Sequence, residues 1–151
     1  AWREKSCRPE GVSMKYLVTI LQLCFSLFAY SDQPTPLSGF EALQWQQRII
    51  LVNNLQDPQS VLTLFEQNKT EIKERDIIWF VFGADEIQTN YQGVLSADFI
   101  ANTRTQYRLK PGQIMLIGKD GGVKFLLDRM DLEAIFNEID AMPMRQNEMV
   151  H

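Results

Sequence analysis

Three short, uninterrupted apolar runs constrain the fold of this chain more than any other feature. They occupy residues 49–52, 77–82 and 114–117. Runs of this length without polar alternation are typical of strands buried on both faces of a sheet. The segments between them place apolar residues at helical spacing, so we expect helices to cover both faces of that sheet.

The helices have recognisable start signals. Asp57 supplies an N-cap acceptor and Pro58 a proline at the first helical position. The helical pattern then continues through Val61, Leu62 and Phe65 and, two turns on, Ile72. Ser96 is placed to cap a helix that carries Phe99, Ile100, Thr103 and Tyr107. Asp131 is placed to cap a last helix that we expect Pro143 to end.

A hairpin closes the predicted sheet. Residues 119–122 (KDGG) tolerate positive φ and predict a tight turn. Val123 and Phe125 alternate with Lys124 after it, which predicts a fourth strand, antiparallel to the third and packed on one side. Residues 83–95 are polar and predict a loop or a hairpin insertion. The order β-α-β-α-β-β-α predicts a thioredoxin-like α/β fold, a three-layer α/β/α sandwich around a mixed four-stranded sheet.

The N-terminal residues have the pattern of a secretory signal peptide. Met14-Lys15 gives a basic start, 16–28 an apolar run, and 29–31 (AYS) a small-x-small cleavage site. The apolar run is short for a membrane span, although a retained anchor is the alternative. We therefore expect an upstream extension plus signal peptide over 1–31, an extended arm over 32–36 and one domain over 37–149. The mature protein would be periplasmic or secreted, without membrane contact.

Composition excludes several kinds of chemistry. The two cysteines, Cys7 and Cys24, both lie in the predicted leader, so the mature part has no thiol. The one histidine is His151, which disfavours nucleophile–histidine pairs and ordinary zinc sites. The net charge is −4, and the leader that would be removed is basic, so nucleic acid is disfavoured as a partner. We expect no cofactor.

Several charged residues lie where strands begin or turn. An aspartate at the mouth of a buried strand, such as Asp76, is either an acid of raised pKa or, as we favour, the partner of a neighbouring arginine. Arg48 and Arg75 are the arginines beside the predicted strand starts. Lys119 and Asp120 lie in the glycine turn, which could serve as an anion-binding nest but is needed for the hairpin in any case.

Methionines and aromatic residues add two further hypotheses. Met142, Met144 and Met149 offer thioethers, which select Cu(I), although methionine more often fills packing gaps. Four aromatic residues would contribute to a binding surface if they are exposed, namely Trp45, Trp79, Tyr91 and Phe99. Of these, we expect Tyr91 to face solvent and Trp79 to lie in the core.

Two segments near the C-terminus carry a resemblance to a known family. Residues 116–124 (LIGKDGGVK) and 139–145 (IDAMPMR), ending at Glu148-Met149, resemble a bacterial family of exported domains of unknown function. The same domain type is similar to the C-terminal module of animal sushi-repeat matrix proteins. Trp45 with Arg48, and Arg75-Asp76, fit as well. The resemblance covers about 37–149 and implies a thioredoxin-like, somewhat peroxiredoxin-like fold, with no assigned activity or catalytic residue.

The redox site of thioredoxins is missing from this sequence. Thioredoxins place Cys-x-x-Cys after the first strand, where a helix start lowers the pKa of a thiol. Residues 53–59 (NNLQDPQ) occupy that position here and contain no sulfur. Thioredoxins also place a cis-proline directly before the third strand, whereas two residues separate Pro111 from Ile114. Thiol oxidoreductase activity is therefore excluded for the mature chain.

These observations favour a binding or interaction module with a protein or small-molecule partner. We expect the contact surface at 83–95 and around Arg48, Asn53 and Asn54. One rival hypothesis is a non-thiol enzyme that uses Asp76, Lys119 or Arg145, and another is a methionine-based Cu(I) carrier. The candidate binding residues are Arg48, Asn53, Asn54, Arg75, Asp76, Lys119, Asp120 and Arg145.

Overall fold

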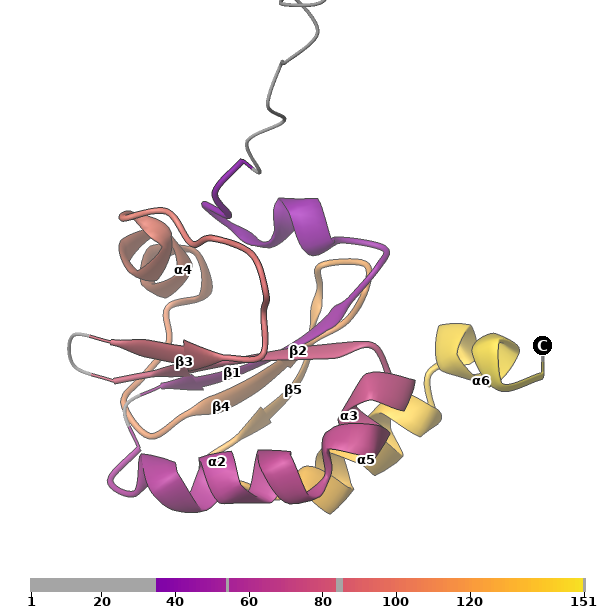
Figure 1. Cartoon of the computed structure of the whole chain (residues 1–151). Helices are drawn as coiled ribbons and strands as arrows, with labels where there is room; N and C mark the ends of the chain where they lie inside the picture. Colours follow the sequence, from indigo (N-terminus) through magenta and orange to yellow (C-terminus); the bar gives the residue numbers. More distant parts are fainter. Residues whose placement is uncertain (1–34, 54, 84–85, 151) are drawn as a thin grey trace, which may run out of the picture. The chain divides into compact units, whose positions relative to one another are not determined.

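A mixed five-stranded sheet forms the centre of the computed structural model, which describes residues 35–53, 55–83 and 86–150 (Figure 1). The strand order is β3-β2-β1-β4-β5. β1 and β2 are parallel, and every other neighbouring pair is antiparallel. The strands are β1 (Arg48–Asn53), β2 (Ile77–Phe82), β3 (Ile87–Thr89), β4 (Ile114–Ile117) and β5 (Val123–Leu127).

Helices cover both faces of this sheet. Figure 1 shows α2, α3 and α5 against one face and η1 with α4 against the other, while α6 lies beyond the end where β1 begins. Their bounds are η1 (Phe40–Leu43), α2 (Pro58–Gln67), α3 (Lys69–Glu74), α4 (Phe99–Tyr107), α5 (Leu132–Asp140) and α6 (Pro143–Val150). Among the described residues, none of the helices is long and apolar enough to span a bilayer.

The core has two halves, one on each side of the sheet. Alternate residues of β1 divide between them, because successive side chains of a strand point to opposite faces. Ile50 and Val52 pack with the α2, α3 and α5 side, and Ile49 and Leu51 with the η1 and α4 side. All four side chains are buried, as the uninterrupted apolar run predicts.

The strand order and directions are those of a thioredoxin-like fold. A central parallel pair, β2 and β1, is extended on one side by the antiparallel hairpin β4–β5. This confirms the predicted fold class. The predicted leader over 1–31, and most of the arm over 32–36, lie outside the described residues.

The sheet has one strand more than predicted. The added strand is β3, and it affects the end of the sheet from which the chain enters β4. β3 lies in the polar segment 83–95 and pairs antiparallel with β2. It returns the chain to the start of β2, where the Asn90 side chain bonds to the backbone of Ile77 and Trp79. α4 then carries the chain to the far end of the sheet, so β4 runs antiparallel to β1.

Two helix boundaries differ from those predicted. The helix expected to run from Pro58 to Ile72 is interrupted at Asn68, which separates α2 from α3. The Asn68 side-chain amide donates to the Leu64 carbonyl at 2.8 Å, a local bond that competes with helix continuation. α4 begins after Asp98, so Ser96 is not its N-cap residue. Asp57 caps α2 as predicted.

Pro143 starts a helix instead of ending one. α5 ends at Asp140, and Pro143 is the first residue of α6. The missing N–H of proline costs nothing at that position, because the first N–H groups of a helix have no partner within it. The C-terminal segment is therefore a folded element with its own contacts to the domain.

Trp45 has an unusual backbone for a large residue. Its φ is 67°, in the left-handed region, while its N–H donates to the Lys119 carbonyl at 2.6 Å. Because glycine adopts this region without the steric cost of a Cβ, we expect Trp45→Gly to be more stable than Trp45→Ala by about 1 kcal/mol. Urea denaturation of the two variants measures the difference, and equal stabilities would contradict the prediction.

Candidate functional site

The predicted site residues divide between the two ends of the sheet. Arg48 is the first residue of β1 and Asn53 the last. Five residue steps along a strand separate them by about 16 Å. The structure therefore does not bring Arg48 and Asn53 together on one surface, and Asn54 lies outside the described residues.

Asn53 ties the end of β1 to the loop that precedes β4. Its side-chain amide donates to the Leu109 carbonyl at 3.2 Å, and its backbone carbonyl accepts from Gly112 at 2.7 Å. A shallow groove of about 730 Å³ lies near this end, lined by residues that include Asp57 and Pro111. The Asp57 carboxylate is engaged in capping α2, and no peptide bond among the described residues is cis, that of Pro111 included.

Arg48 and Glu148 form the centre of a charged network at the opposite end of the sheet. The Arg48 guanidinium is 1% exposed, and its two terminal nitrogens donate to the two Glu148 oxygens at 3.2 Å each. The Nη1 atom also donates to the Arg75 carbonyl at 2.9 Å. Glu148 lies on α6, so this two-point pair fastens the C-terminal helix to the start of β1.

A second carboxylate, Asp140, joins α5 to the same network. Arg75 donates to both of its oxygens, at 3.1 and 2.7 Å, and Arg145 donates to Oδ1 at 3.3 Å. The Arg75 guanidinium also lies 4.4 Å from the centroid of the Phe136 ring, a cation–π contact. Both arginines therefore have carboxylate partners.

Lys119 connects the β4–β5 turn to the network. Its Nζ lies 2.8 Å from Asp76 Oδ2 and 2.7 Å from Glu148 Oε1. Asp76 thus pairs with Lys119, and Arg75 with Asp140, instead of the two neighbours pairing with each other. Asp76 has a φ of 50°, a backbone that turns the chain into β2.

Both central carboxylates are held in the ionised form. Burial by itself raises the pKa of Glu148, but hydrogen bonds from Lys119 and Arg48, with their positive charges, outweigh it and lower that pKa. Burial likewise raises the pKa of Asp140, and the bonds and charges of Arg75 and Arg145 bring it below the usual value. Glu148 and Asp140 are thus ionised partners of the cations around them at neutral pH.

The β4–β5 turn uses its own polar groups. Gly121, with a φ of 81°, donates its N–H to the Gly118 carbonyl at 3.0 Å. The Asp120 carboxylate accepts from the Gly122 N–H at 3.1 Å and from Lys124 Nζ at 2.6 Å. The Lys124 hydrogen bond is the main cause that lowers the pKa of Asp120. This geometry is that of a hairpin turn in which the N–H groups of Gly118, Gly121 and Gly122 already have acceptors.

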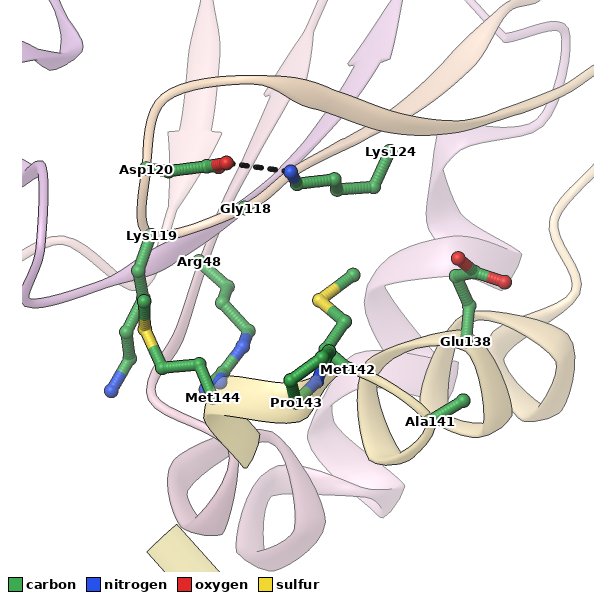
Figure 2. Close-up of a pocket in the computed structure, with 10 residues that line it drawn as sticks. All are labelled: Arg48, Gly118, Lys119, Asp120, Lys124, Glu138, Ala141, Met142, Pro143 and Met144. Atoms are coloured by element: carbon green, nitrogen blue, oxygen red, sulfur yellow. Dashed lines mark hydrogen bonds and ion pairs between the residues drawn. The ribbon is translucent and has the colours of Figure 1, made fainter. Parts of the chain in front are cut away.

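A pocket of about 430 Å³ lies beside the network (Figure 2). One wall is the β4–β5 hairpin, and the other is the end of α5 with the start of α6. Figure 2 shows the Met142 thioether below Lys124 with Glu138 to its right, and Arg48 on the wall near Lys119. The lining residues are Arg48, Gly118, Lys119, Asp120, Lys124, Glu138, Ala141, Met142, Pro143 and Met144.

The methionines separate in the structure. Met142 and Met144 line the pocket, whereas Met149 does not. Five residues of helix rotate Met149 about 140° around α6 from Met144, because each residue turns the helix by about 100°. Two of the three thioethers proposed as Cu(I) ligands therefore line one pocket, and Met149 lies outside it.

The aromatic residues differ in exposure from what the sequence suggested. Trp45 is 63% exposed and lies beside the β4–β5 turn, while Phe99 is fully buried. Tyr91, which we expected to face solvent most, is half-buried and packs against the η1 side of the core. Trp79 is half-buried and stacks on Phe65 at a centroid distance of 4.9 Å.

Sequence reasoning did not single out the two carboxylates that organise the network. Asp140 and Glu148 both lie in or next to the C-terminal motif that carries the family resemblance. Five candidate residues do meet there, namely Arg48, Arg75, Asp76, Lys119 and Arg145. The available signal was that Asp140 and Glu148 accompany the basic residue Arg145 in and next to the C-terminal motif.

Comparison with known proteins identifies the family of this chain. Residues 39–148 match the family described as "Domain of unknown function (DUF4174)". Two solved structures are similar. The reduced 2-Cys peroxiredoxin of Plasmodium vivax has a TM-score of 0.48 and 15% identity, covering 70% of each chain. The mitochondrial 2-Cys peroxiredoxin of Plasmodium falciparum has a TM-score of 0.46 and 10% identity, over 66% of this chain and 77% of that one.

No curated protein is significantly similar in sequence to this chain. The family match covers well over half of the 151 residues, including β1, the β4–β5 hairpin and the α5–α6 segment. The pocket and the charged network both lie within it. The protein therefore belongs to the DUF4174 family.

Proposed function

We propose that this domain is an exported binding module that holds a small ligand in the pocket between the β4–β5 hairpin and the α5–α6 connection. The observation that carries the proposal is the position of that pocket. Most of its lining comes from residues 118–124 and 141–144, which lie in the two motifs that led us to expect a family resemblance, and Arg48 and Glu138 complete it. Export rests on the signal-peptide pattern of residues 14–31.

The size and lining of the pocket suit a small ligand with an apolar body. A volume of about 430 Å³ lies within the range of ligand pockets. Ala141, Met142, Pro143 and Met144 supply apolar surface, and methionine adapts its shape readily. Charged groups stand around this apolar wall, an arrangement typical of sites that orient a ligand.

Catalysis is less well supported than binding. Asp76, Lys119 and Arg145 were the residues proposed for a non-thiol enzyme, and each forms an ion pair in the network. A general base or nucleophile needs a reactive group poised to accept a proton or attack a substrate. These groups instead stabilise one another.

A neutral probe tests the proposed site. We expect 1-octanol to shift the backbone amide resonances of residues 118–124 and 141–144 in ¹⁵N-labelled protein. Ala141→Phe places a ring in the pocket and should abolish those shifts, because Ala141 lines it. Ala101→Phe is the matched control: Ala101 is exposed on α4, against the other face of the sheet. Shifts confined to residues 55–60 and 111–112, or no shifts, would contradict the proposal.

A further inference from the structure

We infer that the pocket selects a small carboxylate with an apolar body, bound through Arg48. This inference rests on the proposed function, since it names the ligand class of the same pocket. The inference is based on the N–H donors along one edge of the Arg48 guanidinium, which the ion pairs of the network do not use.

The donors of Arg48 can be assigned one by one. Arginine carries five N–H donors in a planar fork. Nη1 uses both of its protons, on the Arg75 carbonyl and on Glu148. Nη2 donates one of its two protons to Glu148 Oε1. The buried Nε has no acceptor among the residues that the structure describes.

The two remaining donors lie on one edge of the guanidinium. Nε and the second proton of Nη2 point in the same direction, a spacing that matches the two oxygens of a carboxylate. A buried donor without an acceptor costs free energy. A ligand oxygen at this position would accept a hydrogen bond from Arg48 Nε that no described residue of the protein accepts. Arg48 is one of the residues that form the pocket wall (Figure 2).

The cations that line the pocket already have carboxylate partners. Glu148 pairs with Arg48 and Lys119, and Asp120 pairs with Lys124. The free edge of the Arg48 guanidinium, and not a net positive charge, is therefore the feature that would hold an anion. Figure 2 shows Glu138 on the α5 side of the pocket, across from the wall that holds Arg48 and Lys119. Glu138 therefore repels a carboxylate from its own side and leaves the Arg48 side as the favourable one.

The apolar part of the ligand would lie against the methionines. Met142 is partly buried against the core, and Met144 is exposed at the start of α6. Both are unbranched and can move aside to admit a chain to the Arg48 edge. The site thus combines a two-point anion contact with an adaptable apolar wall.

Three probes of equal chain length separate charge from apolar contact. Octanoate, 1-octanol and octylamine are each titrated into the ¹⁵N-labelled protein, and the shifts of residues 118–124 and 141–144 are followed. We expect octanoate to bind at least tenfold more tightly than 1-octanol, and octylamine more weakly than 1-octanol. Equal affinities for octanoate and 1-octanol would overturn the carboxylate inference but leave the binding module intact. Absence of pocket shifts with all three would overturn both.

Substitutions locate the preference within the site. Met144→Glu adds a negative charge to the pocket wall and should weaken octanoate binding at least fivefold, while 1-octanol changes less. Met149→Glu is the matched control, because Met149 is exposed on the same helix without lining the pocket. Arg48→Lys keeps a positive charge beside Glu148 but lacks the fork, so it should remove the preference for octanoate over 1-octanol. An unchanged preference in both Met144→Glu and a folded Arg48→Lys would contradict the assignment to Arg48.

Discussion

Glu148→Ala is expected to lower the free energy of unfolding by about 2–3 kcal/mol, because it removes the carboxylate partner of a buried arginine while Glu148 itself is partly exposed to solvent. Glu148 bonds to both terminal nitrogens of the buried Arg48 and to Lys119 Nζ. The substitution leaves Arg48 with a buried charge and no carboxylate, and it releases α6 from β1. Equilibrium urea denaturation, followed by circular dichroism, measures the loss.

A control on the same helix separates this effect from a general weakening of α6. Gln146 is exposed on α6, and glutamine and alanine have similar helix propensities, so Gln146→Ala should change stability by less than about 0.5 kcal/mol. Glu148→Gln should fall between the two, because an amide oxygen still accepts a hydrogen bond but carries no charge. Equal effects of Glu148→Ala and Gln146→Ala would show that the network does not hold the helix.

Low pH is expected to destabilise the domain more than Glu148→Ala or Glu148→Gln does, because acid protonates both Glu148 and Asp140. The pKa values of Glu148 and Asp140 are lower in the folded protein than their ordinary values. A carboxylate whose folded-state pKa is depressed contributes stability above its unfolded pKa and loses it as the pH falls through the folded value. With unfolded pKa values near 4, we expect full stability above about pH 5 and a progressive loss below it.

Urea denaturation at a series of pH values from neutral to acid measures this dependence. The double variant Glu148→Gln, Asp140→Asn lacks both titrating groups, so its stability should fall less steeply below pH 5 than that of the wild type. Asp57→Asn is a control that leaves the network intact and keeps a side-chain acceptor at the α2 cap. A parallel acid response in wild type and double variant would show that these carboxylates do not govern it.

The parts of the fold that depend on local chemistry were predictable from the sequence. Apolar runs without polar alternation identified β1, β2 and β4, because a strand buried on both faces needs no polar side. The KDGG sequence at 119–122 identified the hairpin through residues that accept positive φ, and Gly121 has a φ of 81°. Asp57 and Asp131 were recognised as helix caps, and both accept the expected backbone bond.

The elements that were missed depend on distant contacts. β3 is three residues long at the edge of the sheet, and all three are only half-buried, so no apolar pattern marks it. α6 is a polar helix with no buried residues, held by long-range charges. Its main pair joins Arg48 to Glu148 across 100 positions, a separation at which sequence spacing carries no information.

The same reason explains the incomplete prediction of the site. Arg48, Arg75, Lys119 and Arg145 were recognised as individual charged residues, but their partners follow from how the sheet end meets α5 and α6. The pocket also arises from that junction, since Lys124 lies on β5 and Met142 lies in the α5–α6 connection. The expected surface near Asn53 followed the usual site of thioredoxins, which lies at the other end of β1.

A crystal structure of the protein with octanoate tests the central claim most directly. We predict density for the ligand between the β4–β5 hairpin and the α5–α6 connection, with its carboxylate in hydrogen-bond contact with Arg48 Nε and its chain against Met142 and Met144. An occupied groove beside Asp57 and Pro111 with this pocket empty, or octanoate with its carboxylate turned away from Arg48, would contradict the account.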